Sequence, residues 1–155
     1  MRRIGPIHRW AVCLCLCLGL APRLAGQAPA DAVGRIKVAS GAASVVRGGQ
    51  AIPAEVGATV LRLDVLRTGA DGRLAVTLKD DTRVSLASNT EVGLAQFEYE
   101  PAAGRLSLVI RMLRGVMSFV SGHIAKLSPE AVRLETPTSV IGVRGTHALV
   151  RVDAQ

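Results

Sequence analysis

The sequence predicts an all-β domain, on three observations. Apolar residues alternate with polar ones over several short segments, a pattern typical of strands with one buried face. Glycine or proline interrupts the chain at short intervals from Gly34 to Gly145, which leaves few windows long enough for a helix. No cysteine follows Cys17, so the domain must be held by burial and backbone hydrogen bonds rather than by disulfides.

Residues 1–26 are expected to form a secretory signal peptide. A start with three arginines precedes an apolar run over residues 10–21, and the small residues Ala25 and Gly26 follow it. The run is shorter than the roughly 20 residues that span a bilayer. We therefore expect cleavage, no stable transmembrane segment afterwards, and a periplasmic or secreted protein. An uncleaved anchor and, from Arg2-Arg3, twin-arginine export are the alternatives.

Charge and histidine spacing argue against several classes of function. Beyond residue 26 the chain has 15 basic and 12 acidic residues, a net charge of +3, without clustered Lys or Arg. We therefore expect no nucleic-acid partner. His123 and His147 are 24 positions apart, so we expect no metal ion or cofactor. The sequence has no Gly-x-Ser-x-Gly elbow and no Gly-Lys-Ser/Thr phosphate loop, so we expect no enzymatic activity.

The first elements follow from composition and alternation. Residues 27–33 are small and rich in alanine and proline, which predicts a disordered leader. Gly34–Val38 opens the domain as a strand, with Ile36 and Val38 expected on one face.

The clearest hairpin runs from Leu74 to Leu86 with Asp80-Asp81 as its turn, because aspartate tolerates left-handed backbone angles. One face of this hairpin is apolar (Leu74, Val76, Leu78, Val84 and Leu86), and the other is polar (Arg73, Thr77, Lys79, Arg83 and Ser85).

Later elements are predicted in the same way. A second hairpin joins Val92–Glu98 to Arg105–Leu113 through a loop over residues 99–104, and Val132 and Leu134 mark a further strand.

An apolar-Arg-Gly pattern recurs at Val46-Arg47-Gly48, Leu113-Arg114-Gly115 and Val143-Arg144-Gly145. Its spacings of 67 and 30 residues are unequal, so it is no solenoid repeat. We expect each glycine to end a strand with positive φ and each arginine to point to solvent.

The segment ETPTSVIGVRGT, residues 135–146, resembles the signature that closes the FecR domain. Gly34–Val38, Val65–Gly69 and the turn at Leu113–Gly115 agree with that family in order and spacing, so the resemblance covers roughly residues 34–152. It implies a compact roll of short, twisted, largely antiparallel strands. Asp81 departs from the family, which usually has glycine there. The signature residues are Thr136, Pro137, Gly142, Val143, Arg144, Gly145 and Thr146.

The resemblance also limits the role of the chain. The iron regulators of the family carry a cytoplasmic anti-sigma segment, a transmembrane helix and a receptor-contact domain besides the FecR domain. This sequence shows the FecR domain alone. We therefore expect a single-domain exported member that does not act as a complete anti-sigma factor.

The expected function is a non-catalytic interaction module that binds an envelope protein in signalling or regulation. The alternative is a cell-wall or polysaccharide-binding domain, against which the scarcity of aromatic residues counts, since Tyr99 is the sole tyrosine. Two surfaces are candidates: a basic face of Arg73, Lys79 and Arg83, and the open edge of a terminal strand, Ala148–Val152, which carries Arg151. The alternative for these two surfaces is that neither binds a partner, because the basic face is only solvated and the strand edge is covered.

Overall fold

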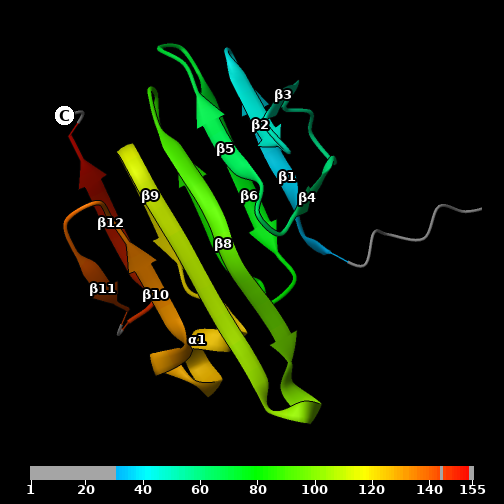
Figure 1. Ribbon diagram of the computed structural model, residues 1–155, viewed down its shortest axis with the longest axis vertical. Helices are drawn as coiled ribbons and strands as arrows, with labels where there is room; N and C mark the ends of the chain where they lie inside the picture. The colour runs from blue at the N-terminus through cyan, green and yellow to red at the C-terminus, as the bar shows by residue number, and fades with distance from the viewer. Residues whose placement is uncertain (1–30, 144, 154–155) are drawn as a thin grey trace, which may run out of the picture.

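The computed structural model describes residues 31–143 and 145–153, which form two β-sheets that share one long strand (Figure 1). The predicted signal peptide and residues 27–30 of the predicted leader lie outside the described residues. The first strand begins at Ala32, and Val33 is buried. The ordered domain thus starts two residues before the Gly34 that we expected to open it. None of the described helices is long and apolar enough to cross a membrane.

Six strands form the first sheet, called sheet A. In spatial order they are β4 (Thr59–Leu61), β1 (Ala32–Ser40), β6 (Arg73–Leu78), β7 (Arg83–Leu86), the C-terminal part of β9 (Arg105–Val120) and β12 (His147–Val152). Every neighbouring pair in sheet A is antiparallel.

The second sheet, sheet B, contains the N-terminal part of β9. Its order is β3 (Gln50–Pro53), β2 (Ala43–Arg47), β5 (Val65–Thr68), β8 (Glu91–Glu100), β9, β10 (Val132–Glu135) and β11 (Val140–Gly142). Only the β9–β10 pair among these is parallel. Three short helices complete the described part: η1 (Pro101–Ala103), α1 (His123–Leu127) and η2 (Pro129–Ala131). The prediction of an all-β fold of largely antiparallel strands is therefore confirmed.

The core lies where the apolar faces of the two sheets meet. Large, fully buried side chains come from sheet A, such as Ile36, Leu74 and Phe119, and from sheet B, such as Leu66 and Leu94, and they belong to one cluster. Burial of this aliphatic surface is the main favourable contribution to folding. It fixes which face of each strand points inward and therefore which residues are left for the surface.

The predicted β6–β7 hairpin is confirmed. Asp81 has a φ of 65°, the left-handed conformation expected for this turn. Asp80 is fully buried, and its carbonyl accepts a 2.7 Å hydrogen bond from the backbone N of His123, which joins the turn to α1. The inward and outward faces alternate as predicted.

Two details of the strands differ from the prediction. A β-bulge lies between Ile36 and Val38, so Ile36 is buried whereas Val38 is 48% exposed on the outer face. The expectation that these two residues share one face was wrong, because the extra residue, Lys37, reverses the alternation. The second hairpin exists, but β8 continues to Glu100 and the connection shrinks to residues 101–104.

The glycines of the three apolar-Arg-Gly segments all have positive φ, at +56° for Gly48, +94° for Gly115 and +132° for Gly145. Two of the arginines do more than face solvent. Arg47 makes two hydrogen bonds to the buried Asp64, and Arg114 forms an ion pair with Glu91. Arg144 lies outside the described residues. Positive φ is confirmed for all three glycines. The expectation that each glycine ends a strand holds for Gly48, which follows β2, but is wrong for Gly115, which lies inside β9, whereas Gly145 lies between β11 and β12. The expectation that the arginine points to solvent is wrong for Arg47.

Candidate functional site

The outer face of sheet A is hollowed along one row of paired residues. Val38 on β1 is opposite Ala75 on β6, which is opposite Ser85 on β7, and the row continues through Ser118 on β9 to Leu149 on β12. The three middle side chains are small and the two end ones are large, exposed and apolar, with Leu149 71% exposed. These residues line a hollow of about 540 Å³. We call it the outer hollow.

Basic side chains flank the outer hollow on both sides. The next row along the strands runs Arg35, Thr77, Arg83, Val120 and His147. On the other side, Arg73 lines the hollow and Arg151 is opposite Val116, a further lining residue. Among its described lining residues Asp71 is the sole acid, and its Oδ1 accepts a hydrogen bond from the backbone N of Ala42. The outer hollow is therefore lined mainly by small and apolar residues and is flanked by basic side chains on both sides.

The four basic residues proposed from the sequence fall in two places. Arg73, Arg83 and Arg151 surround the outer hollow, whereas Lys79 lies beyond it, in a smaller hollow of about 260 Å³ with Arg35 and Lys37. All four predicted residues are exposed, and none forms an ion pair with another described residue. They are free to meet an anionic partner.

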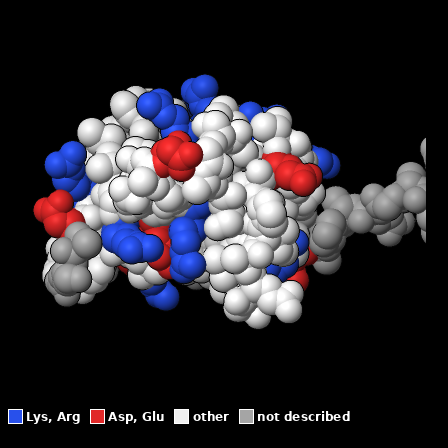
Figure 2. Space-filling view, turned by 90° about the horizontal axis from the view of Figure 1, so that it is seen from above, with Lys and Arg blue, Asp and Glu red and all other residues white. Residues whose placement is uncertain are grey.

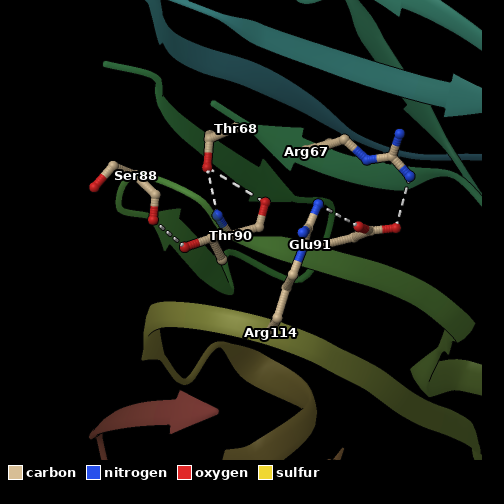
Figure 3. Close-up of polar contacts among 6 residues, drawn as sticks. All are labelled: Arg67, Thr68, Ser88, Thr90, Glu91 and Arg114. Carbon is tan, nitrogen blue, oxygen red and sulfur yellow. Dashed lines mark hydrogen bonds and ion pairs between the residues drawn. The ribbon is translucent and has the colours of Figure 1, made fainter. Parts of the chain in front are cut away.

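Several arginines elsewhere form ion pairs within the fold. Glu91 on β8 forms ion pairs with Arg67 at 2.8 Å and with Arg114 at 3.2 Å (Figure 3). The hydrogen bond from Arg67, aided by the charges of both arginines, lowers the pKa of Glu91 although partial burial opposes this. Figure 2 likewise shows acidic side chains interspersed with basic ones on the end of the molecule seen from above. The basic flanks of the outer face of sheet A differ from this end of the molecule, because their arginines have no described ion-pair partner.

The outer side of β12 is an open sheet edge. β12 pairs with β9 alone, and no other strand of the described chain pairs with it. The backbone N of Ser121 donates to the carbonyl of Thr146 at 3.0 Å, and Ala87 N donates to the carbonyl of Val116 on the opposite side of β9. Since antiparallel partners alternate in hydrogen bonding, Ala148, Val150 and Val152 bond to β9. The N–H and C=O groups of His147, Leu149 and Arg151 point to the open side.

The signature residues build the approach to this edge. Thr136 and Ser139 close a tight turn, in which Thr136 N donates to the Ser139 carbonyl at 2.8 Å and Ser139 N donates to Thr136 Oγ1 at 3.0 Å. Pro137 lies inside the turn, Gly142 ends β11 and is exposed, and Val143 is buried.

The last signature residues lead directly into β12. The carbonyls of Gly145 and Thr146 accept hydrogen bonds from the side chain and backbone of Ser121. A second cleft, of about 660 Å³, separates the 136–139 turn from the inward side chains Val150 and Val152. We call it the signature cleft. In the described part of the chain the signature therefore shapes the surroundings of the β12 edge.

Sequence reasoning missed a set of buried polar residues that hold the turns. Asp64 is 1% exposed and accepts hydrogen bonds from Arg47 and from the backbone N of Leu61. Its hydrogen bonds raise the pKa of Arg47. Thr90, also buried, donates its backbone N to Thr68 Oγ1 at 3.0 Å (Figure 3). The available sequence signal was a polar residue just before a predicted segment, since Asp64 precedes Val65–Gly69 and Thr90 lies two residues before Val92.

Two contacts involve histidine side chains, which in other proteins can take part in catalysis or metal binding. Ser118 Oγ lies 2.8 Å from His147 Nε2 on the exposed face of sheet A, and His123 pairs with Asp81 at 3.3 Å. Nucleophilic catalysis by a serine and a histidine also needs an orienting acid and donors for an oxyanion, and no carboxylate is bonded to His147 among the described residues. The described part also holds no group of three or more potential metal ligands.

Comparisons with known proteins gave one match. The model of the family described as FecR protein matches residues 64–155. The match covers most of sheet B, the β6–β7 hairpin, β12 and the whole signature. No curated protein and no solved structure gave a significant match.

Proposed function

Because the chain belongs to the FecR family, we propose that it is an exported, non-catalytic module that binds an envelope protein in signalling or regulation. The family is a regulatory one whose domains are typically periplasmic, which supports this assignment. The surface that we assign to the partner is the outer face of sheet A together with the open edge of β12.

The observation that carries the proposal is the arrangement of that surface. A hollow of small and apolar residues, with the exposed Leu149 at its end, lies between rows that hold Arg73, Arg83 and Arg151. None of these arginines forms an ion pair with a described carboxylate. Exposed apolar surface rimmed by charge is typical of protein interaction sites. An open strand edge can add main-chain hydrogen bonds to the same partner.

The sugar-binding alternative lacks comparable support. Sugar rings are usually bound by stacking on an exposed aromatic side chain. Tyr99 is half-buried against the core and its ring lies 6.4 Å from that of His123. The outer hollow has no aromatic lining residue. These observations favour a protein partner.

Co-isolation from an envelope extract with three variants tests the proposal. Arg151→Pro removes a main-chain donor on the open side of β12, whereas Arg73→Glu with Arg83→Glu reverses the flanking charge. Arg133→Glu, an exposed reversal on β10, is the matched control. We expect a captured protein to be lost with at least one of the first two changes and kept with the control, while circular dichroism shows a retained fold. Capture that survives all the changes would mean that both surfaces are wrong.

A further inference from the structure

Among the four outer strands of the described sheets, β12 is the longest and the least protected. The outer strands β3, β4 and β11 have four, three and three residues, and β3 ends in Pro53. β12 has six residues and contains neither proline nor glycine. Natural edges are usually shortened, bulged or given inward charges to prevent pairing. Here the inward residues Ala148, Val150 and Val152 are all apolar, so the edge is suited to accept a strand.

An added strand would place its side chains in a defined register. The residues whose N–H and C=O groups face the open side, His147, Leu149 and Arg151, also project their side chains from the outer face. Directly opposed residues of antiparallel strands lie about 5.5 Å apart at such hydrogen-bonded positions. Alternate residues of the incoming strand would therefore lie beside Arg151, Leu149 and His147 in turn.

Charge complementarity specifies what those alternate residues should be. Arg151 is exposed and has no described ion-pair partner, and the row of His147 also holds Arg83 and Arg35. Leu149, between them, is apolar and reaches the outer hollow. Like charges directly opposite each other destabilise a strand pair, whereas opposite charges and apolar pairs stabilise it. A strand with an acid, an apolar residue and an acid at alternate positions fits this edge.

The intervening side chains of such a strand would face inward, toward the signature cleft. The cleft is bounded by Val150 and Val152 on one side and by Thr136 and Pro137 on the other, and the charged residues Arg114, Arg151 and Asp153 also line it. Short side chains that combine a methyl and a hydroxyl group, such as threonine, suit a cleft lined by both apolar and polar residues. The signature turn would thus cover the added strand from within.

On the basis of the function proposed above, we propose that the partner contributes a β-strand of the pattern acid-x-apolar-x-acid, paired antiparallel to β12. Side-chain charge selects the strand and main-chain hydrogen bonds hold it. A polyanion such as an acidic polysaccharide would respond to the same positive charge. It would not require hydrogen bonds from the His147, Leu149 and Arg151 backbone.

Synthetic peptides test this directly with the chain that begins at Gln27. The probe is the labelled heptapeptide TETVTET, measured by fluorescence anisotropy. TTEVETT, of the same composition, moves the acids to the opposite face from the valine, and TKTVTKT reverses the charge. We expect both controls to bind about ten-fold more weakly. N-methylation of the two Glu amides and the Val amide of TETVTET should abolish binding, because those groups face β12.

Changes in the protein provide the reciprocal test. Arg151→Glu should reverse the preference toward TKTVTKT, and Arg151→Pro should remove binding of all peptides, while Arg133→Glu should change nothing. Because a short strand binds weakly, each peptide is also joined to the C-terminus by a flexible Gly/Ser linker, which raises its effective concentration. The TETVTET fusion should then melt at a higher temperature than the TTEVETT fusion.

Several results would overturn the strand proposal. They are equal affinity for TETVTET and TTEVETT, binding that survives N-methylation, or an absence of binding and of any melting difference in the linked forms. Survival after N-methylation would indicate recognition of a polyanion. These failures are distinct from failure of the proposed function, since capture of an envelope protein that depends on Arg73 and Arg83 would still support the module.

Discussion

Gly115 packs against Thr90 so closely that no side chain fits between them. A Cβ on Gly115 would lie 2.5 Å from the Thr90 Cα and would also overlap its hydroxyl. The Thr90 Oγ1 accepts a 3.0 Å hydrogen bond from the backbone N of Val116. Arg114 is the last residue of β9 paired with β8, and Gly115 is the first paired with β12. The contact therefore lies where β9 leaves sheet B and enters sheet A.

Gly115→Ala should accordingly destabilise the domain by about 2 to 4 kcal/mol, because it adds both strain at a φ of +94° and steric overlap with a buried residue. Gly142→Ala is the matched control. Gly142 is exposed, has open space where a Cβ would lie and no positive φ, so its change should stay within about 0.5 kcal/mol. Urea unfolding measures both. Similar losses in the two variants would contradict the role of the corner.

Gly145 tests backbone conformation without steric overlap. Its φ is +132°, yet no atom lies within 4 Å of an added Cβ. Gly145→Val should therefore destabilise by more than about 1 kcal/mol through backbone strain alone, and Gly142→Val should have a smaller effect. Thermal melts compare the variants. A midpoint for Gly145→Val equal to that of the unmodified protein would show that the position is an ordinary one.

Glu91 makes the stability of sheet B depend on pH. Its pKa in the folded protein is lowered, chiefly by the hydrogen bond from Arg67, so its contribution is present above the unfolded pKa of about 4.3 and is lost as pH falls through the folded value. Glu91→Gln should be less stable than the unmodified protein at pH 7. The difference in melting temperature should shrink as pH falls below about 4.3. A constant difference from about pH 7 to about pH 3 would contradict this account.

Much of sheet A was predictable from local pattern. Alternation identified the β6–β7 hairpin and its inward face, and Asp80-Asp81 identified its turn. Alternation could not show the bulge at Lys37, because a bulge is a property of the pairing with β6 and not of one strand. It is this bulge that turns Val38 outward and makes it one end of the outer hollow.

The site itself was only partly predictable. Arg73, Arg83 and Arg151 were named from the sequence, but their common arrangement depends on β9, which carries Val116, Ser118 and Val120 between β7 and β12. Pairing between segments so far apart in sequence leaves no local signal. The buried positions of Asp64 and Thr90 were missed for a related reason, since their partners come from other strands.

Export can be checked by intact mass. We expect the protein recovered from the envelope or the medium to begin near Gln27 and to lack all three cysteines, because cleavage after Gly26 leaves a small residue at the site, whereas cleavage after Ala28 would put Pro29 next to it. Mass spectrometry of the purified protein gives the answer. A species that retains Trp10 would instead indicate an anchored form.

Residue-resolved hydrogen exchange of β12 tests the central claim, that a partner binds at this open edge. In the free chain, the amides of Ala148, Val150 and Val152 should exchange slowly and those of His147, Leu149 and Arg151 rapidly. Addition of the partner captured from the envelope should protect the rapid set, because its strand accepts those hydrogen bonds. Protection that leaves His147, Leu149 and Arg151 unchanged in a saturated complex would contradict binding at β12.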